Sequence, residues 1–143
     1  MFFIGEIRDI SGNTKGGGVQ LNNANGETTI NMDGSDGHIT CVSLTQTSQE
    51  KSKKNFEKLQ DNALNILKTI DIYKYNLKNE KDTDKKHIGF VIGDNFNYSQ
   101  EVTSLDNQGV DNYSFTSLCC KAIQELSTKV EELENKIKEM EEK

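Results

Sequence analysis

The chain has 143 residues, of which 33% are hydrophobic, and it contains no tryptophan. Its mean hydropathy of -0.72 leaves little apolar surface for a core, so the chain is either partly disordered or completed by other subunits. The apolar residues are strongly patterned, which favours other subunits. The net charge of -6 argues against nucleic acid as the main partner, because phosphate binding needs a basic face.

The sequence offers no recognisable site for a metal or a cofactor. Its three cysteines, Cys41, Cys119 and Cys120, have no metal-binding spacing, and there are only two histidines. We therefore expect the cysteines to be small buried thiols, and we expect the chain to fold in a reducing compartment. The opening "MFFIGEIRDI" carries three charged residues within its apolar run, so it is neither a signal peptide nor a membrane span. We expect no membrane partner.

Residues 1–46 combine many glycines with short runs of strand character. Between the runs, Asn-Gly at 25–26 and Asp-Gly at 33–34 and 36–37 predict tight turns. Strands this short cannot make a stable core within one chain. The region is therefore either a flexible glycine-rich linker or the end of an intertwined β stalk, of β-helix type, shared among identical chains. The regular spacing of Val, Leu, Ile and Met favours the stalk.

The next zone changes from a helical period to an alternating one. A stripe at helical spacing predicts an amphipathic helix over 47–69, and its members are Phe56, Leu59, Ala63, Ile66, Leu67 and Ile70. "IDIYKYNL" (70–77) and "HIGFVIGDNF" (87–96) then predict a long β-hairpin over 70–96, followed by a connection over 97–113. The charged run between the two strands indicates a solvated loop rather than a binding site.

The last zone, 114–143, predicts a coiled coil. Its seam residues are spaced 3, 4, 3, 4 and 3, and they are Ile123, Leu126, Val130, Leu133, Ile137 and Met140. In this register Lys129 and Lys136 lie at g and pair with Glu134 and Glu141 at e, which favours parallel strands in register. A solitary helix packed on its own domain would not require this charge match. The seam residues nominally favour dimers, whereas the stalk favours three chains.

The stretch "TSQEKSKKNF" (47–56) has two interpretations that are compatible with each other. Thr47 and Glu50 form the pattern of a helix capping box, with Ser48 at the first helical position. Alternatively, Ser48 is a nucleophile and Lys53 is its base. Residues five apart in one α-helix lie about 140° apart in azimuth, so this pair can meet only if Ser48 lies at or before the helix start, or if the lysine comes from another chain.

The order of these zones resembles the self-cleaving intramolecular chaperone domain at the C-terminus of phage tail spikes, tail fibres and endosialidases. The likeness covers residues 43–143, and "GVDNYSFTSLCCKAIQELSTKVEELENKI" (109–137) and "KKHIGFVIGD" (85–94) carry most of it. It implies a homotrimer that registers the upstream stalk of the same polypeptide and then leaves by autoproteolysis. It also implies a catalytic Ser48–Lys53 dyad. The family usually has Asp after the serine, whereas this chain has Gln49, and Lys51-Ser52 replaces Arg-Leu.

The sequence therefore predicts an α+β homotrimer with a stalk over 1–46 and a chaperone domain over 47–143. Cleavage is expected beside Ser48, at Thr47–Ser48 or Ser48–Gln49, and ring closure favours the first bond. His87 could orient or shuttle a proton, although the sequence favours a structural histidine in a strand. The resemblance implies a virion tail protein made in the bacterial host cytoplasm. The alternative is a trimerising, receptor-facing tip that does not cleave and stays on the fibre.

Overall fold

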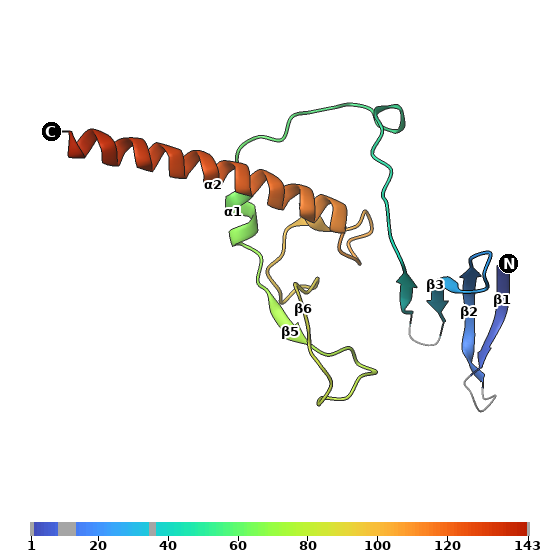
Figure 1. The fold of residues 1–143 in the computed structure, drawn as a ribbon. Coiled ribbons are helices and arrows are strands. Elements are labelled where there is room, and N and C mark those ends of the chain that lie inside the picture. The colour runs from blue at the N-terminus through green and yellow to red at the C-terminus, as the bar shows by residue number, and fades with distance from the viewer. Residues whose placement is uncertain (1, 9–13, 35–36, 143) are drawn as a thin grey trace. The chain divides into compact units, whose positions relative to one another are not determined.

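The computed structural model describes residues 2–8, 14–34 and 37–142 of the chain, and the side chains from residue 17 onward. The chain divides into two compact units, Met1–Phe56 and Glu57–Lys143, and each is described by itself. Figure 1 shows a sheet in the first unit and a long helix with a short helix and a hairpin in the second. This division falls after the boundary at 46 that the composition predicts.

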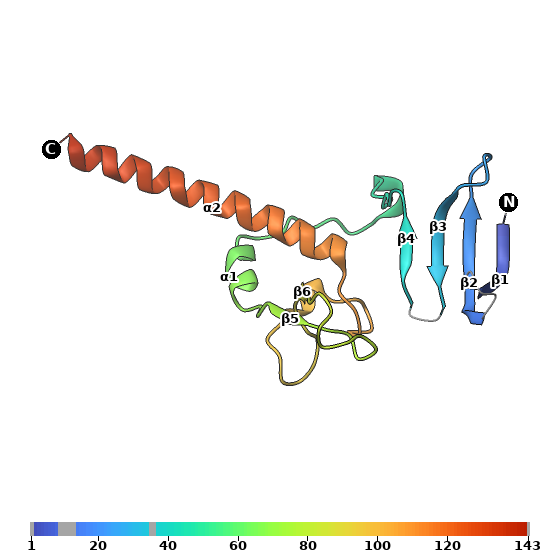
Figure 2. The ribbon, with the colours of Figure 1, turned by 60° about the horizontal axis from the view of Figure 1, so that its bottom comes forward.

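The first unit is a four-stranded antiparallel meander. The strands β1 (Phe2–Arg8), β2 (Thr14–Asn22), β3 (Thr28–Asp33) and β4 (Ile39–Cys41) lie in sequence order, each paired with the next (Figure 2). The predicted turns are present where the structure describes them: Gly26 and Gly37 have φ of 85° and 76°, a region that favours glycine. Asp36 and its role in the last turn lie outside the described residues.

Because these residues form a paired sheet, the strand-forming residues are not a flexible glycine-rich linker. Each described strand pairs within its own chain, whereas an intertwined stalk pairs strands of different chains. None of the described side chains of this unit is buried. The sheet thus forms within one chain, and the side chains described from residue 17 onward give it no buried core within its own unit.

The second unit has a small core where two helices and a short turn meet. Helix α1 (Ala63–Lys68) packs on the N-terminal half of α2 (Asn112–Glu141), next to the turn η2 (Gln100–Val102). Val102 is fully buried. The rest of the buried set comprises Ala63, Ile70, Phe90, Leu118 and Ala122.

Helix α2 begins at Asn112, two residues before the predicted start, because Asp111 caps it. The Asp111 carboxylate accepts hydrogen bonds from the backbone N–H groups of Tyr113 and Ser114, both at 3.0 Å. The hydrogen bonds from Ser114 and Tyr113 hold the pKa of Asp111 below its ordinary value. The cap fixes where the 30-residue helix starts.

The predicted helix over 47–69 is mostly wrong. Only Ala63–Lys68 is α-helical, and one 3-10 turn, η1 (Glu50–Ser52), lies upstream. Asn55 has φ of 55°, a left-handed conformation that a right-handed helix cannot contain. The apolar stripe is therefore divided: its C-terminal members enter the core, whereas Phe56 and Leu59 are 67% and 52% exposed.

The hairpin is present but is paired over a shorter length than predicted. Strands β5 (Tyr73–Tyr75) and β6 (His87–Gly89) are antiparallel, with Tyr75 opposite His87. Glu80 organises the loop between them, because its carboxylate accepts from the Leu77 backbone N–H at 2.7 Å and contacts His87 Nε2 at 2.8 Å. The charged loop is therefore structured where it joins the two strands of the hairpin.

Candidate active site

The turn η1 lies between the two residues predicted to carry the chemistry. Gln49 before it (φ -73°, ψ 144°) and Lys53 after it (φ -131°, ψ 161°) both have extended backbones. The turn is closed by backbone hydrogen bonds from Ser52 N to Gln49 O at 3.0 Å and from Lys53 N to Glu50 O at 2.9 Å. A single turn with extended flanks reverses the chain within five residues.

This reversal brings the two side chains together. Lys53 Nζ donates a hydrogen bond to Ser48 Oγ at 2.6 Å, within one unit of one chain. The expectation that Ser48 must precede any helix in order to reach Lys53 agrees with the geometry, since the intervening helical segment is only Glu50–Ser52. The pair is thus within the distance that proton transfer between a nucleophile and a base requires.

The capping box predicted from Thr47 and Glu50 does not form. The residue that caps η1 is Gln49, and no side chain makes the capping hydrogen bond. Glu50 lies inside the turn rather than at the third position of an α-helix. The segment 47–56 is therefore arranged around the serine–lysine contact and not as the beginning of a long helix.

The serine–lysine pair is open to solvent. Residues 45–56 are all exposed, and they include the expected cleavage-site residues Thr47, Ser48 and Gln49. Lysine becomes an effective base when burial or nearby cations disfavour its charged form. Lys51 and Lys54 flank Lys53 in the sequence, but burial is not provided within the described segment. The two side chains are in contact, and the described residues of this segment leave them exposed to solvent.

His87 is held within the hairpin. Its ring stacks on that of Tyr75, with centroids 5.7 Å apart and planes 27° apart, while Nε2 contacts Glu80. These contacts match the structural strand histidine that the sequence left open as one interpretation. They give His87 a defined place in the fold that does not depend on a proton-transfer role.

The predicted seam lies along an uncovered face of α2. The exposed fractions of its six side chains range from 46% at Val130 to 67% at Met140. Nearer the start of the same helix, Phe115, Leu118 and Ala122 pack toward α1 and the core. Helix α2 therefore has apolar side chains near its start that its own unit covers, and a longer apolar seam that its own unit leaves open.

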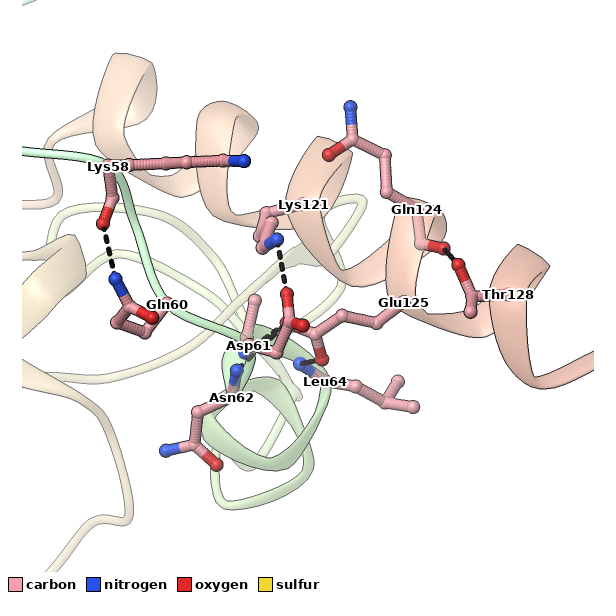
Figure 3. A network of polar contacts seen from close by, with 10 residues as sticks. Lys58, Gln60, Asp61, Asn62, Leu64, Lys121, Gln124, Glu125 and Thr128 are labelled. Carbon is pink, nitrogen blue, oxygen red and sulfur yellow. Dashed lines mark hydrogen bonds and ion pairs between the residues drawn. The ribbon is translucent and has the colours of Figure 1, made fainter.

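A polar cluster that ties α1 to α2 was not predicted from the sequence. The Glu125 carboxylate accepts hydrogen bonds from the backbone N–H groups of Asn62, Ala63 and Leu64, at 2.9, 2.8 and 3.0 Å (Figure 3). Beside it, Lys121 forms an ion pair with Asp61. Glu125 continues the stripe of Phe115, Leu118 and Ala122 at spacings of 3, 4 and 3, and this signal could have identified it.

The cluster shifts the ionisation of both acidic residues. Hydrogen bonds from the backbone N–H of Leu64, and from those of Ala63 and Asn62, hold the pKa of Glu125 below its ordinary value. The hydrogen bond and charge of Lys121 lower the pKa of Asp61. Both carboxylates are therefore ionised where they tie the helices together.

The three cysteines are free, and Cys41 and Cys120 are exposed rather than buried as expected. Cys119 is intermediate in burial. Among residues 2–8, 14–34 and 37–142, no helix has the length and apolar character needed to cross a membrane. The same residues contain no cluster of three or more side chains suited to holding a metal ion.

A family model described as chaperone of endosialidase matches residues 48–94. Searches of the curated proteins and of the solved structures found no match. The matched segment begins at Ser48, includes Lys53 and α1, and ends five residues after β6. It confirms the family resemblance read from the sequence. Over residues 48–94, the chain is therefore similar to the chaperone of endosialidase family.

Proposed function

We propose that this chain is an intramolecular chaperone that assembles as a homotrimer, brings the β-rich segments of its polypeptide into register, and then releases itself by autoproteolysis beside Ser48. The observation that carries the proposal is the 2.6 Å hydrogen bond between Lys53 Nζ and Ser48 Oγ, at the start of the segment that matches the chaperone family. The polypeptide that it serves is a phage tail spike or tail fibre.

The serine–lysine contact supports a two-step cleavage. Neutral Lys53 Nζ accepts the Ser48 hydroxyl proton while Oγ attacks the carbonyl carbon of Thr47 through a five-membered ring. The Thr47–Ser48 C–N bond then breaks, and the Ser48 amino group takes the proton from Lys53. Water hydrolyses the resulting ester, which leaves a carboxylate on Thr47 and restores the Ser48 hydroxyl.

Exposure of the dyad links the reaction to assembly. A lysine ammonium has no lone pair with which to take a proton, and removal of water disfavours the ammonium form of a lysine. Packing of neighbouring copies around residues 47–56 would remove water from Lys53 and activate it. Cleavage would then follow assembly, so that a chain does not lose its chaperone before its strands are in register.

Gln49 is the residue that argues for slow cleavage or for none. It lies next to Ser48 with an extended backbone, where the family usually carries Asp. The alternative function, a retained trimeric tip, needs the same assembly but no chemistry. Gln49→Asp should therefore accelerate fragment formation if the wild-type chain cleaves itself slowly, and it should start fragment formation in an otherwise intact chain if Gln49 is what prevents cleavage.

A denaturing gel on the assembled chain tests the proposal. Wild type should yield fragments 1–47 and 48–143, and Ser48→Ala and Lys53→Ala should remain intact. Ser52→Ala and Lys54→Ala are matched controls, because they change the same residue types within or next to the same turn and leave the hydrogen-bonded pair in place. Wild-type chains that assemble but stay whole, or Ser48→Ala chains that are still cut, would overturn the protease role.

A further inference from the structure

One face of the sheet in the first unit is apolar across three strands. The backbone register places Val19 opposite Met32 and Met32 opposite Ile39. It also places Leu21 opposite Ile30 and Ile30 opposite Cys41. Directly opposed residues project from the same side of a sheet, so these six side chains form two adjacent rows, which we call the apolar face.

The other side of the same strands is polar. Gln20, Asn31 and Thr40 are opposed to one another across β2, β3 and β4. Since successive residues alternate between the two sides, a sheet with this pattern has one side suited to water and one suited to a core. The alternation therefore indicates that the apolar face packs against another layer, and the six residues are not isolated surface hydrophobic residues.

The described residues of the first unit leave the apolar face partly open, with Val19, Leu21 and Ile30 intermediate in burial. Met32 and Ile39 are 42% and 62% exposed, and Cys41 is exposed. Apart from the sheet, the described residues of this unit form only the turn η1. A sheet with one apolar side is stable when a second layer packs on it, and the described residues of this unit supply no such layer.

The second unit indicates which molecule supplies that layer. Its uncovered seam repeats in heptads, and Lys129 and Lys136 at g are matched to Glu134 and Glu141 at e, which specifies a parallel copy of the same chain. The two units are covalently joined. Copies that associate through α2 therefore hold their sheets at high effective concentration.

We propose that the apolar face of the β1–β4 meander packs against the same face of other copies, so that each chain contributes a whole folded meander to a shared core. The inference rests on the homo-oligomer proposed above. It replaces the intertwined stalk predicted from the sequence with a stalk in which each layer is a meander that forms within one chain. The partner is a second copy of this chain. Its contact residues are Val19, Leu21, Ile30, Met32, Ile39 and Cys41.

Cys41 provides a native probe of this contact. The full chain carrying Ser48→Ala, which keeps both units joined, is reacted with N-ethylmaleimide, and labelling at Cys41 is measured by peptide mass spectrometry. The mass of the same Ser48→Ala chain in the same buffer is measured by sedimentation equilibrium. Labelling should be about tenfold or more slower in the assembled chain than in a Leu133→Asp variant that sediments as a monomer, because the contact must open before the thiol reacts.

Two substitutions on adjacent residues separate the faces. Ile30→Lys, in the centre of the apolar face, should restore fast labelling of Cys41 in the assembled chain. Asn31→Lys, on the polar side of the same strand, should leave labelling slow. The labelling of Cys120, which is exposed on α2, reports independently on reagent access.

The outcomes separate this inference from the proposed function. Fast Cys41 labelling at trimer mass overturns the shared core but leaves the chaperone homotrimer standing. Slow labelling in chains that sediment as monomers also overturns it, because the cover then comes from the same chain. A Ser48→Ala chain that is monomeric with fast labelling overturns both the homotrimer and the shared core.

Discussion

Glu125 on α2 accepts a hydrogen bond from the backbone N–H of Ala63, the first residue of α1, at 2.8 Å. The two residues are 62 positions apart in the chain. A six-residue helix has too few internal hydrogen bonds to be stable alone, so its formation depends on contacts such as this one. Glu125 therefore acts as a remote cap that fixes α1 on α2 (Figure 3).

Replacing Glu125 by Gln should release the N-terminus of α1. The amide side chain keeps one acceptor oxygen, but it loses the charge and the second oxygen that accepts from Leu64. We expect the backbone amides of residues 62–64 to exchange with solvent deuterium at close to unprotected rates, while the amides in the middle of α2 stay protected. Glu132→Gln, about two turns further along α2, is the control and should leave residues 62–64 unchanged.

The same contact should be sensitive to acid. The hydrogen bonds that Glu125 accepts hold its pKa below the ordinary 4.5. A carboxyl with a lower pKa in the folded state adds stability at pH above its unfolded value, and this contribution is lost as the pH falls through the folded pKa. Protection of the amides of residues 62–64, measured relative to the intrinsic exchange rate at each pH, should therefore fall below about pH 4.5 in wild type. Glu125→Gln should show little of this change.

The charged groups around Glu125 set the detail of that acid response. Asp61 raises the pKa of Glu125 through its charge, and Lys121 lowers the pKa of Asp61. Lys129 and Glu132 line the same hollow on α2. Acid sensitivity that persists undiminished in Glu125→Gln would assign the response to Asp61 instead.

Leu118 should contribute strongly to the stability of the second unit. It is 4% exposed and lies in the core with Val102 and Ala63. Leu118→Ala should lower the free energy of unfolding by about 2–5 kcal/mol, because it removes buried methyl groups and leaves a cavity. Leu105→Ala is the matched control: Leu105 is fully exposed, so we expect a change within about 0.5 kcal/mol. Urea titration at equal protein concentration measures both.

The seam of α2 should control assembly. Full burial of a Leu, Ile or Val side chain contributes about 1.5–3 kcal/mol, whereas an exposed Lys–Glu pair contributes about 0.2–1 kcal/mol. Leu133→Asp should therefore abolish association, and Lys129→Ala should weaken it only slightly. Sedimentation equilibrium should give about 48 kDa for wild type, three times 16.1 kDa. A wild-type monomer would contradict the homotrimer, and a dimer would contradict its threefold form.

Gly34 should be irreplaceable in the turn after β3. Its backbone N–H donates to the carbonyl oxygen of Gly17 at 2.8 Å, and a Cβ on Gly34 would collide with that oxygen. Gly34→Ala should reduce protection of the β2 and β3 amides from exchange. Gly17→Ala is the control, because a Cβ there meets nothing within 4 Å. Equal loss of protection in both variants would indicate that glycine content in general, rather than this contact, supports the turn.

The sequence by itself determined the features that depend on local periodicity and turn chemistry. The heptad spacing predicted α2, the alternation predicted β5 and β6, and the glycine dipeptides predicted the turns at Gly26 and Gly37. The spacing of Ser48 and Lys53, with the limits of helix geometry, also predicted that the serine lies outside any helix that leads to the lysine. Each of these signals lies within a few residues along the chain.

Only the tertiary structure decided how much of the apolar stripe over 56–70 becomes helix. The left-handed backbone at Asn55 and the non-helical one at Asn62 break the run, and the periodicity of side chains does not show either. Where α1 begins is fixed by Glu125, more than sixty residues away, and a short helix adopts the start that its distant partner can cap. Local pattern selects which segments can form elements, and long-range hydrogen bonds and packing set where those elements begin and end.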